Sequence, residues 1–348
     1  MIRILIVEDS QVVALLLKAI FEAESDMQVV GHAKNGREGV QLAHELKPDL
    51  ITMDIRMPEM DGFEATRMIM ANDPAPVVVI SSGVDDEELQ TTFRAIEEGA
   101  LSVIEKPPGV AHPDFEVVRR ELVETVRAMA EVKVIRRRSL SRTTGTGSYA
   151  LTMQQPAKDY ELVAIGCSTG GPQVLQKMLS LLPADFPVPV VVTQHISKGF
   201  IGGLVSWLAG NTTLKIKQAE QGEQLQAATV YFAPDDQHLQ VVRHGSRLVV
   251  KLSADAPENG FRPSASVMLK SVATACASRA VGVLLTGMGV DGADGLLALR
   301  QAGGHTLVQD QESAVVYGMP GAAIALDAVD QVVAMDGMAT YLCRVVGK

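Results

Sequence analysis

The stretch Leu162-Val-Ala-Ile-Gly-Cys-Ser-Thr-Gly-Gly-Pro172 decides the fold of the C-terminal half of the chain. It begins as an apolar run typical of a buried strand, and its glycines and proline are typical of a tight turn into a helix. Two later apolar runs, 188–194 and 281–290, also lead into a polar residue. If all three runs are parallel strands of one sheet, three polar side chains meet beyond their carboxyl ends: Ser168, His195 and Asp291.

Serine, histidine and aspartate are the residue types of a hydrolytic triad. We expect the Ser168 hydroxyl to attack a carbonyl carbon, and His195 to accept its proton and return it to the leaving alcohol. Asp291 would orient the imidazole and stabilise its charged form. The glycine-rich backbone at 286–289 is a candidate oxyanion hole, because glycine lets N–H groups approach closely. The C-terminal half is therefore predicted to be a serine hydrolase.

Each of these motifs also has an interpretation without catalysis. A glycine-rich turn after a strand can hold a nucleotide phosphate, His195 can be an ordinary strand-end histidine, and Asp291 can cap a helix or a turn. Cys167 is a rival nucleophile by chemistry, but alternation along the strand directs its side chain away from Ser168 and into the helix layer. The hydrolase interpretation is favoured because the three residue types occur together.

The N-terminal half gathers charged and polar residues at the ends of four apolar strands: Glu8, Asp9, Asp54, Ser81 and Lys106. Taken singly, each could be a solvated loop residue. Three neighbouring carboxylates raise one another's pKa unless a cation neutralises them, and Mg²⁺ prefers such oxygen ligands. We therefore predict a metal site of Glu8, Asp9 and Asp54. Asp54 would accept a phosphoryl group, Lys106 would pair with its oxygens, and Ser81 would hydrogen-bond to it.

These motifs resemble two known families in a fixed order. The N-terminal half resembles a two-component receiver domain at Val7–Ser10, Met53–Gly62 and Lys106-Pro107. The segment from Gly166 to Pro320 resembles the catalytic domain of the chemotaxis protein-glutamate methylesterases, the CheB family. Its matching motifs are Gly166–Gly171, Gln194-His195, Phe261–Ser264, Leu285–Gly292 and Tyr317–Pro320. The resemblance spans nearly the whole chain.

The resemblance implies a function. Members of this family hydrolyse glutamate methyl esters on methyl-accepting chemoreceptors to glutamate and methanol, and many also deamidate receptor glutamines, which gives adaptation in bacterial chemotaxis. The receiver inhibits the hydrolase until a chemotaxis histidine kinase phosphorylates the aspartate that corresponds to Asp54, with Mg²⁺ in the receiver pocket. Ester hydrolysis itself uses no cofactor. The match assigns the triad to Ser168, His195 and Asp291, and part of the oxyanion hole to Met288.

The sequence departs from the commonest family pattern at three positions. Glu8 replaces an aspartate, and its extra methylene would let it reach the metal through a water molecule. Val103 stands where many single-domain receivers carry an aromatic residue, so the switch is expected to run through a packed surface. Ser266 stands where an aspartate is frequent, beside the Phe261–Ser264 motif.

Length and composition indicate two domains. A chain of 348 residues exceeds the size of one hydrophobic core. We expect domains at 1–135 and 159–348, joined by a flexible linker at 136–158 that carries five basic and no acidic residues. The net charge of −10 favours a solvated hinge over nucleic-acid binding for this linker. The three cysteines suggest neither a disulfide framework nor a zinc site.

The sequence predicts the α/β class, with two doubly wound domains. The N-terminal one is expected to be a five-stranded parallel (βα)5 receiver. The C-terminal one is expected to have a mainly parallel sheet with an antiparallel edge hairpin at 238–250, which turns at His244-Gly-Ser246. No apolar run is long enough to span a bilayer and no leader segment is evident, so we expect a cytoplasmic protein without membrane insertion. A regulatory scaffold with a vestigial hydrolase is the alternative.

Overall fold

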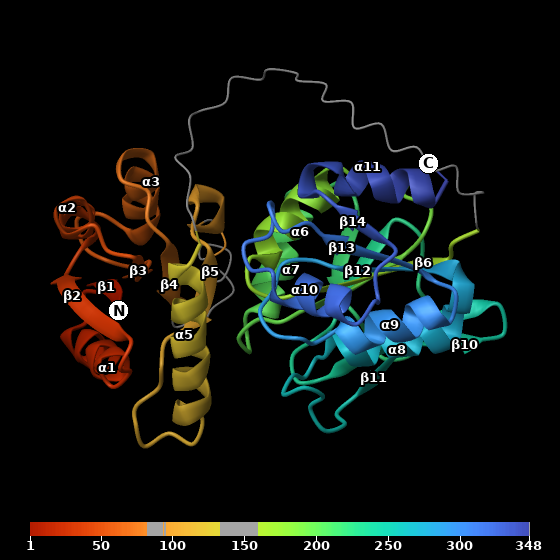
Figure 1. Ribbon diagram of the computed structural model, residues 1–348, viewed down its shortest axis with the longest axis horizontal. Helices are drawn as coiled ribbons and strands as arrows, with labels where there is room; N and C mark the ends of the chain where they lie inside the picture. Colours follow the sequence, from red (N-terminus) through yellow and green to blue (C-terminus); the bar gives the residue numbers. More distant parts are fainter. Residues whose placement is uncertain (82–92, 94, 133–158, 348) are drawn as a thin grey trace.

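The computed structural model describes residues 1–81, 93, 95–132 and 159–347. These residues form two α/β domains that lie next to each other (Figure 1). The predicted basic linker at 136–158 lies outside the described residues. In the described part of the chain, no helix is both long enough and apolar enough to cross a membrane.

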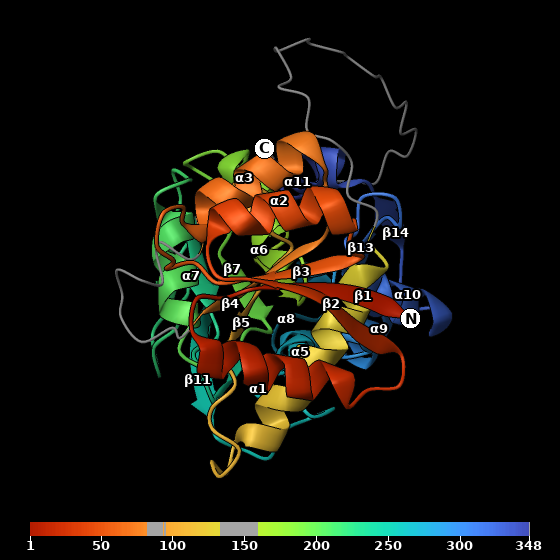
Figure 2. The same cartoon turned by 90° about the vertical axis from the view of Figure 1, so that its left-hand side faces the viewer.

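The N-terminal domain is built on a five-stranded parallel sheet with the strand order β2-β1-β3-β4-β5. Its strands are β1 (Ile2–Val7), β2 (Met27–Ala33), β3 (Leu50–Met53), β4 (Val77–Ser81) and β5 (Ser102–Glu105). Helices cover both faces (Figure 2), which explains why β3 and β4 are buried at every position. One face carries α1 (Gln11–Glu22) and α5 (Phe115–Ala130), and the other carries α2 (Gly36–Leu46) and α3 (Gly62–Asn72).

The C-terminal domain is built on a seven-stranded parallel sheet with the strand order β14-β13-β12-β6-β7-β9-β8. The strands are β6 (Leu162–Cys167), β7 (Val190–Gln194), β8 (Lys215–Gln218), β9 (Thr229–Phe232), β12 (Ala280–Leu284), β13 (His305–Gln309) and β14 (Gln331–Val333). One face packs against α6 (Gly171–Ser180), α7 (Ile201–Ala209) and α11 (Met335–Val345). The other packs against α8 (Ala265–Cys276), α9 (Ala293–Gln301) and α10 (Gly318–Ala325).

The predicted hairpin consists of β10 (His238–His244) and β11 (Arg247–Ser253), and it turns at Gly245. It forms a two-stranded antiparallel sheet of its own beside α8 instead of extending the parallel sheet. The backbone N–H of Val241 donates to the Ser271 hydroxyl of α8 at 2.9 Å. The hairpin therefore packs as an additional layer over this helix.

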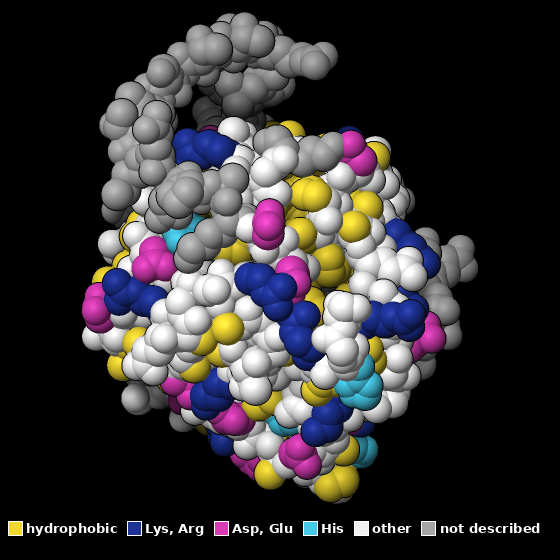
Figure 3. Space-filling view, turned by 90° about the vertical axis from the view of Figure 1, so that its right-hand side faces the viewer, with side chains coloured by type: hydrophobic (Ala, Val, Ile, Leu, Met, Phe, Trp, Pro, Cys, Tyr) yellow, Lys and Arg dark blue, Asp and Glu magenta, His cyan; other side chains and the backbone are white. Residues whose placement is uncertain are grey.

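The surface of the C-terminal domain that faces away from the N-terminal domain carries charges of both signs. Basic and acidic side chains are interspersed there among apolar ones (Figure 3).

The two domains meet through α5, the segment before β5, and the helices α6 and α7. The Trp207 indole stacks on Phe93 with ring centroids 5.8 Å apart, and its Nε1–H donates to Glu97 Oε1 at 2.7 Å. The Gln173 amide donates to the carbonyl oxygen of Ala100. Apolar packing therefore continues from one domain into the other.

Candidate active site and acidic pocket

Strand pairing in the C-terminal sheet brings the three predicted triad residues to one edge. Strand β6 lies between β7 and β12, with Cys167 opposite Gln194 and Gly166 opposite Leu284. The next residues along these strands are therefore neighbours. The His195 N–H donates to the carbonyl of Cys167 at 2.9 Å, and the Ser168 N–H donates to the carbonyl of Thr286 at 3.0 Å.

His195 and Asp291 form a buried pair. The imidazole Nε2 lies 2.9 Å from Asp291 Oδ2, and the two side chains are 6% and 0% exposed. The carboxylate also accepts hydrogen bonds at the N-terminus of α8, from the Ser264 hydroxyl at 2.7 Å and the Ala265 N–H at 2.7 Å. A helix N-terminus favours negative charge, so α8 holds Asp291 as an anion and fixes its direction.

The electrostatics of this pair support an ionised aspartate. Burial by itself would raise the pKa of Asp291. The hydrogen bond and charge of His195 and the hydrogen bonds from Ser264 and Ser266 outweigh burial, so the pKa of Asp291 lies well below its ordinary value. Asp291 therefore stays ionised and accepts a hydrogen bond from the Nε2–H of His195.

Ser168 and His195 line one cavity of about 600 Å³, together with Met288. Among the described residues, no hydrogen bond joins the Ser168 hydroxyl to His195, and the imidazole Nδ1 is buried without a partner. Gly287 lies against Ser168, because a Cβ at this glycine would be 2.8 Å from the Ser168 Cβ. Only glycine allows the loop with Met288 to come this close to the predicted nucleophile.

Cys167 does not reach this cavity. Its side chain is fully buried, and its Sγ lies 3.1 Å from Gln194 Oε1. Burial raises the pKa of the Cys167 thiol far above its ordinary value, so the thiol stays protonated. Its packing is that of a structural residue, whereas Ser168, the predicted nucleophile, lines the cavity.

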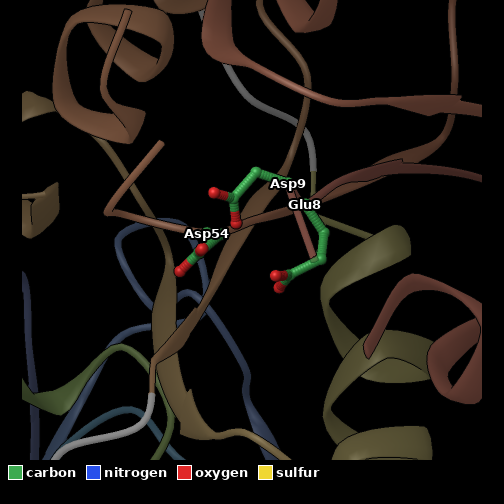
Figure 4. Close-up of side chains that lie close together, drawn as sticks. All are labelled: Glu8, Asp9 and Asp54. Carbon is green, nitrogen blue, oxygen red and sulfur yellow. The ribbon is translucent and has the colours of Figure 1, made fainter. Parts of the chain in front are cut away.

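The N-terminal domain brings its five predicted pocket residues to the carboxyl ends of β1, β3, β4 and β5. Carboxylate oxygens of Glu8, Asp9 and Asp54 lie within 4.8 Å of one another (Figure 4). Lys106 Nζ lies 3.0 Å from Glu8 Oε2 and 3.0 Å from Asp54 Oδ2. Ser81 is buried at the end of β4, and its carbonyl accepts the N–H of Lys106 at 2.9 Å.

The charges in this pocket favour a bound cation. Burial, and next the charge of Asp54, raise the pKa of Glu8. Burial also raises the pKa of Asp54, against the opposing charge of Lys106. Two buried carboxylates share one lysine, so a divalent cation with oxygen preference would relieve their repulsion. The donor set of Glu8, Asp9 and Asp54 fits Mg²⁺.

The sequence assigned no contact with the triad to three residues around the active site, although Phe261 and Ser264 lie in a motif already noted. Ser264 and Asn259 contact Asp291, and the Phe261 ring covers His195. The signal for Ser264 was its position as an N-cap before the apolar pattern of α8, where it accepts the Val267 N–H at 3.3 Å. No local pattern indicates that such a cap also serves a carboxylate from a distant loop.

Comparisons with known proteins identify the families of the two domains. The profile described as CheB methylesterase matches residues 163–342, and that of the response regulator receiver domain matches residues 4–112. Two curated relatives are named protein-glutamate methylesterase/protein-glutamine glutaminase. The one from Methanospirillum hungatei is 47% identical over 94% of this chain and 93% of its own. The one from Myxococcus xanthus is 47% identical over 98% of this chain and 96% of its own.

One solved structure covers the C-terminal domain. The crystal structure of the Thermotoga maritima CheB methylesterase catalytic domain is 35% identical, has a TM-score of 0.53, and covers 54% of this chain and 99% of its own. The family profile and the nearly full-length relatives lead to the same assignment. The chain belongs to the CheB methylesterase family, with a response regulator receiver domain preceding its catalytic domain.

Proposed function

We propose that this protein is a phosphorylation-regulated esterase that hydrolyses glutamate methyl esters of chemoreceptors, and that it also deamidates receptor glutamines. The observation that carries this proposal is the buried pair of His195 and Asp291, because His195 of this pair lines the same cavity as Ser168. The names of the curated relatives support the substrate class. Because the substrate helices of such receptors lie in the cytoplasm, we propose the cytoplasm as the place of action.

The residues would act as follows. Ser168 Oγ attacks the ester carbonyl carbon while His195 takes the hydroxyl proton and Asp291 stabilises the imidazolium. Backbone N–H groups near Met288 and at the start of α6 hold the negative charge on the carbonyl oxygen. His195 then returns the proton to the leaving oxygen, methanol departs, and water releases the glutamate by the reverse sequence. A glutamine amide would follow the same route with ammonia as the leaving group.

The receiver pocket would supply the regulation. Asp54 accepts a phosphoryl group from a histidine kinase, and Lys106 and Ser81 bind the phosphoryl oxygens. Glu8, Asp9 and Asp54 would hold Mg²⁺, which neutralises charge on the phosphoryl group when it is bound. This role is supported by the raised pKa of the buried Glu8 and Asp54 carboxyls.

The link from this pocket to the active site runs along β5. Lys106 follows this strand, and Val103 and Ile104 within it line the same cavity as Ser168. Glu121 of α5 also lines it. We infer that the receiver covers the active site in this arrangement. A phosphoryl group at Asp54 would attract Lys106, shift the end of β5 and weaken the contact between the two domains.

The domain limits at 1–135 and 159–348, with 136–158 as the linker, stay predictions.

Release of methanol tests the proposed function. The full chain is incubated with methyl-labelled chemoreceptor fragments, with and without Mg²⁺ and a small phosphodonor such as acetyl phosphate. We expect a low basal rate, a higher rate with both additions, and no release by Ser168→Ala. If the unsubstituted chain releases no methanol under either condition, the proposed substrate is wrong.

A further inference from the structure

The imidazole of His195 is covered on one face by a phenyl ring. The centroids of His195 and Phe261 are 3.9 Å apart, and the two rings are parallel to within 3°. Both side chains line the cavity that contains Ser168. A flat ring in this position blocks rotation of the imidazole out of its plane, so Phe261 acts on the geometry of the predicted base.

A tight turn holds the phenyl ring in place. Asn259 and Gly260 have φ values of 54° and 85°, and the two backbone hydrogen bonds between Glu258 and Phe261 measure 3.0 and 3.1 Å. Positive φ at both central positions with an Asn-Gly sequence is the type I′ turn. Lys270 of α8 forms an ion pair with Glu258. The turn that carries Phe261 is therefore tied to α8, the helix whose N-terminus also donates hydrogen bonds to Asp291.

The two ring nitrogens of His195 have different surroundings. Nε2 lies 2.9 Å from Asp291 Oδ2, whereas Nδ1 is buried and has no hydrogen-bond partner among the described residues. Asp291 is ionised and accepts hydrogen bonds from the Ser264 hydroxyl and the Ala265 N–H. An ionised carboxylate has no hydrogen to donate, so the hydrogen between His195 and Asp291 belongs to Nε2. The lone pair of the neutral ring is then on Nδ1. In the usual serine triad the aspartate holds Nδ1 and the serine faces Nε2.

We propose that His195 acts as the base through Nδ1, and that Phe261 is the positioning residue that keeps the imidazole in this orientation. As Ser168 Oγ bonds to the carbonyl carbon, its proton moves to Nδ1 while Nε2–H stays on Asp291. When the bond from carbon to the methoxy oxygen breaks, the proton on Nδ1 moves to that oxygen and methanol leaves. This inference deepens the proposed function and rests on it for the identity of the leaving group.

The position of the imidazole hydrogen can be observed without an activity assay. Nitrogen NMR of the full chain labelled with ¹⁵N-histidine distinguishes a protonated from a bare ring nitrogen, and His195→Gln identifies which of the seven histidines gives the signal. We expect His195 in its neutral form to carry hydrogen on Nε2 and none on Nδ1. A ring with hydrogen on Nδ1 and a bare Nε2 overturns the proposal.

The role of Phe261 is tested by a matched pair of substitutions. Phe261→Leu removes the flat face, and we expect kcat to fall roughly 10- to 100-fold with little change in KM, because the base is misplaced. Phe261→Tyr keeps the face and should retain a kcat close to that of the unsubstituted chain. In Phe261→Leu the His195 nitrogen signals should broaden. The exposed Leu181 lies outside the site, and Leu181→Ala serves as the control.

Two different substrates allow the role of Phe261 to be tested separately from the proposed receptor substrate. Hydrolysis of 4-nitrophenyl acetate reports on the base alone, whereas methanol release from receptor fragments reports on the proposed substrate. If Phe261→Leu keeps the kcat and the nitrogen signals of the unsubstituted chain, the positioning role is wrong even when methanol is released. If methanol is absent but Nε2 carries the hydrogen and the loss on 4-nitrophenyl acetate appears, the base assignment stands and only the substrate fails.

Discussion

The hydroxyl of Ser197 in the catalytic domain donates a hydrogen bond to Glu121 Oε1 of the receiver at 3.0 Å. Glu121 also lines the cavity that contains Ser168 and His195. The contact therefore connects the regulatory domain to the edge of the active site. Burial raises the pKa of Glu121, the Ser197 hydrogen bond opposes this rise, and the charges of Glu105 and Glu124 add to it.

Removing the donor should weaken the contact between the domains. In Ser197→Ala the Glu121 carboxylate loses a hydrogen bond, and a bond of this kind contributes about 0.5–1.5 kcal/mol. We expect the basal rate of methanol release to rise roughly 2- to 10-fold and the phosphodonor to stimulate less. Ser180→Ala is the matched control, because the Ser180 hydroxyl donates to the Lys177 carbonyl within α6 and, among the described residues, makes no contact with the receiver. Equal basal rates in both variants would contradict a role of this contact in inhibition.

Inhibition should depend on pH through Glu121. The raised pKa means that the docked arrangement binds a proton more tightly than the undocked one. Between the ordinary glutamate pKa and the raised value, docking therefore weakens as the pH rises, and it is strongest below this window. The measurement is the rate of a chain lacking residues 1–140 divided by the rate of the full chain. This ratio should decrease with rising pH and become flat in Glu121→Gln.

Phosphodonor stimulation should depend on Asp54 and on metal. Asp54→Asn keeps the shape of the pocket but removes the carboxylate that accepts the phosphoryl group. We expect no incorporation of labelled phosphate from acetyl phosphate, no stimulation, and an unchanged basal rate. Removal of Mg²⁺ with EDTA should abolish stimulation of the unsubstituted chain in the same way. Stimulation that persists in Asp54→Asn would place the phosphoryl group on another residue.

Ser264 should contribute to both stability and activity. Ser264→Ala removes the N-cap of α8 and a donor to Asp291, so we expect a loss of about 0.5–2 kcal/mol in the free energy of unfolding. It should also lower kcat by about tenfold or more, because Asp291 no longer points firmly at His195. Asp61→Ala removes the N-cap of α3 in the receiver and is the control. If both variants lose stability and neither loses basal kcat, Ser264 acts only as a cap.

The sequence predicted the sites that follow directly from strand order. Ser168, His195 and Asp291 come after apolar runs, and parallel strands place such positions at one edge of the sheet. The same argument predicted that Glu8, Asp54 and Lys106 lie together at one edge of the receiver sheet. The predicted hairpin exists, but its position over α8 depends on packing with Ser271 that no local pattern contains.

Residues whose role depends on tertiary packing could not be predicted. Phe261 directly follows the Asn259-Gly260 turn signal, yet only the folded chain brings this turn onto His195. Glu121 belongs to the charged positions of an amphipathic helix, which usually remain in water. It becomes an interface residue only because the second domain covers it with Ser197.

The cavity shared by the two domains has a volume of about 600 Å³. One turn of an α-helix with its side chains, about 10 Å across and 5.4 Å high, fills roughly 400 Å³. A cavity of this size holds little more than one helical turn, so the docked arrangement does not admit the several turns of a helical protein substrate. The receiver would then select substrates by size, because small esters would reach Ser168 and macromolecules would not. The reactivity of Ser168 itself would be the same in the docked and the undocked arrangement.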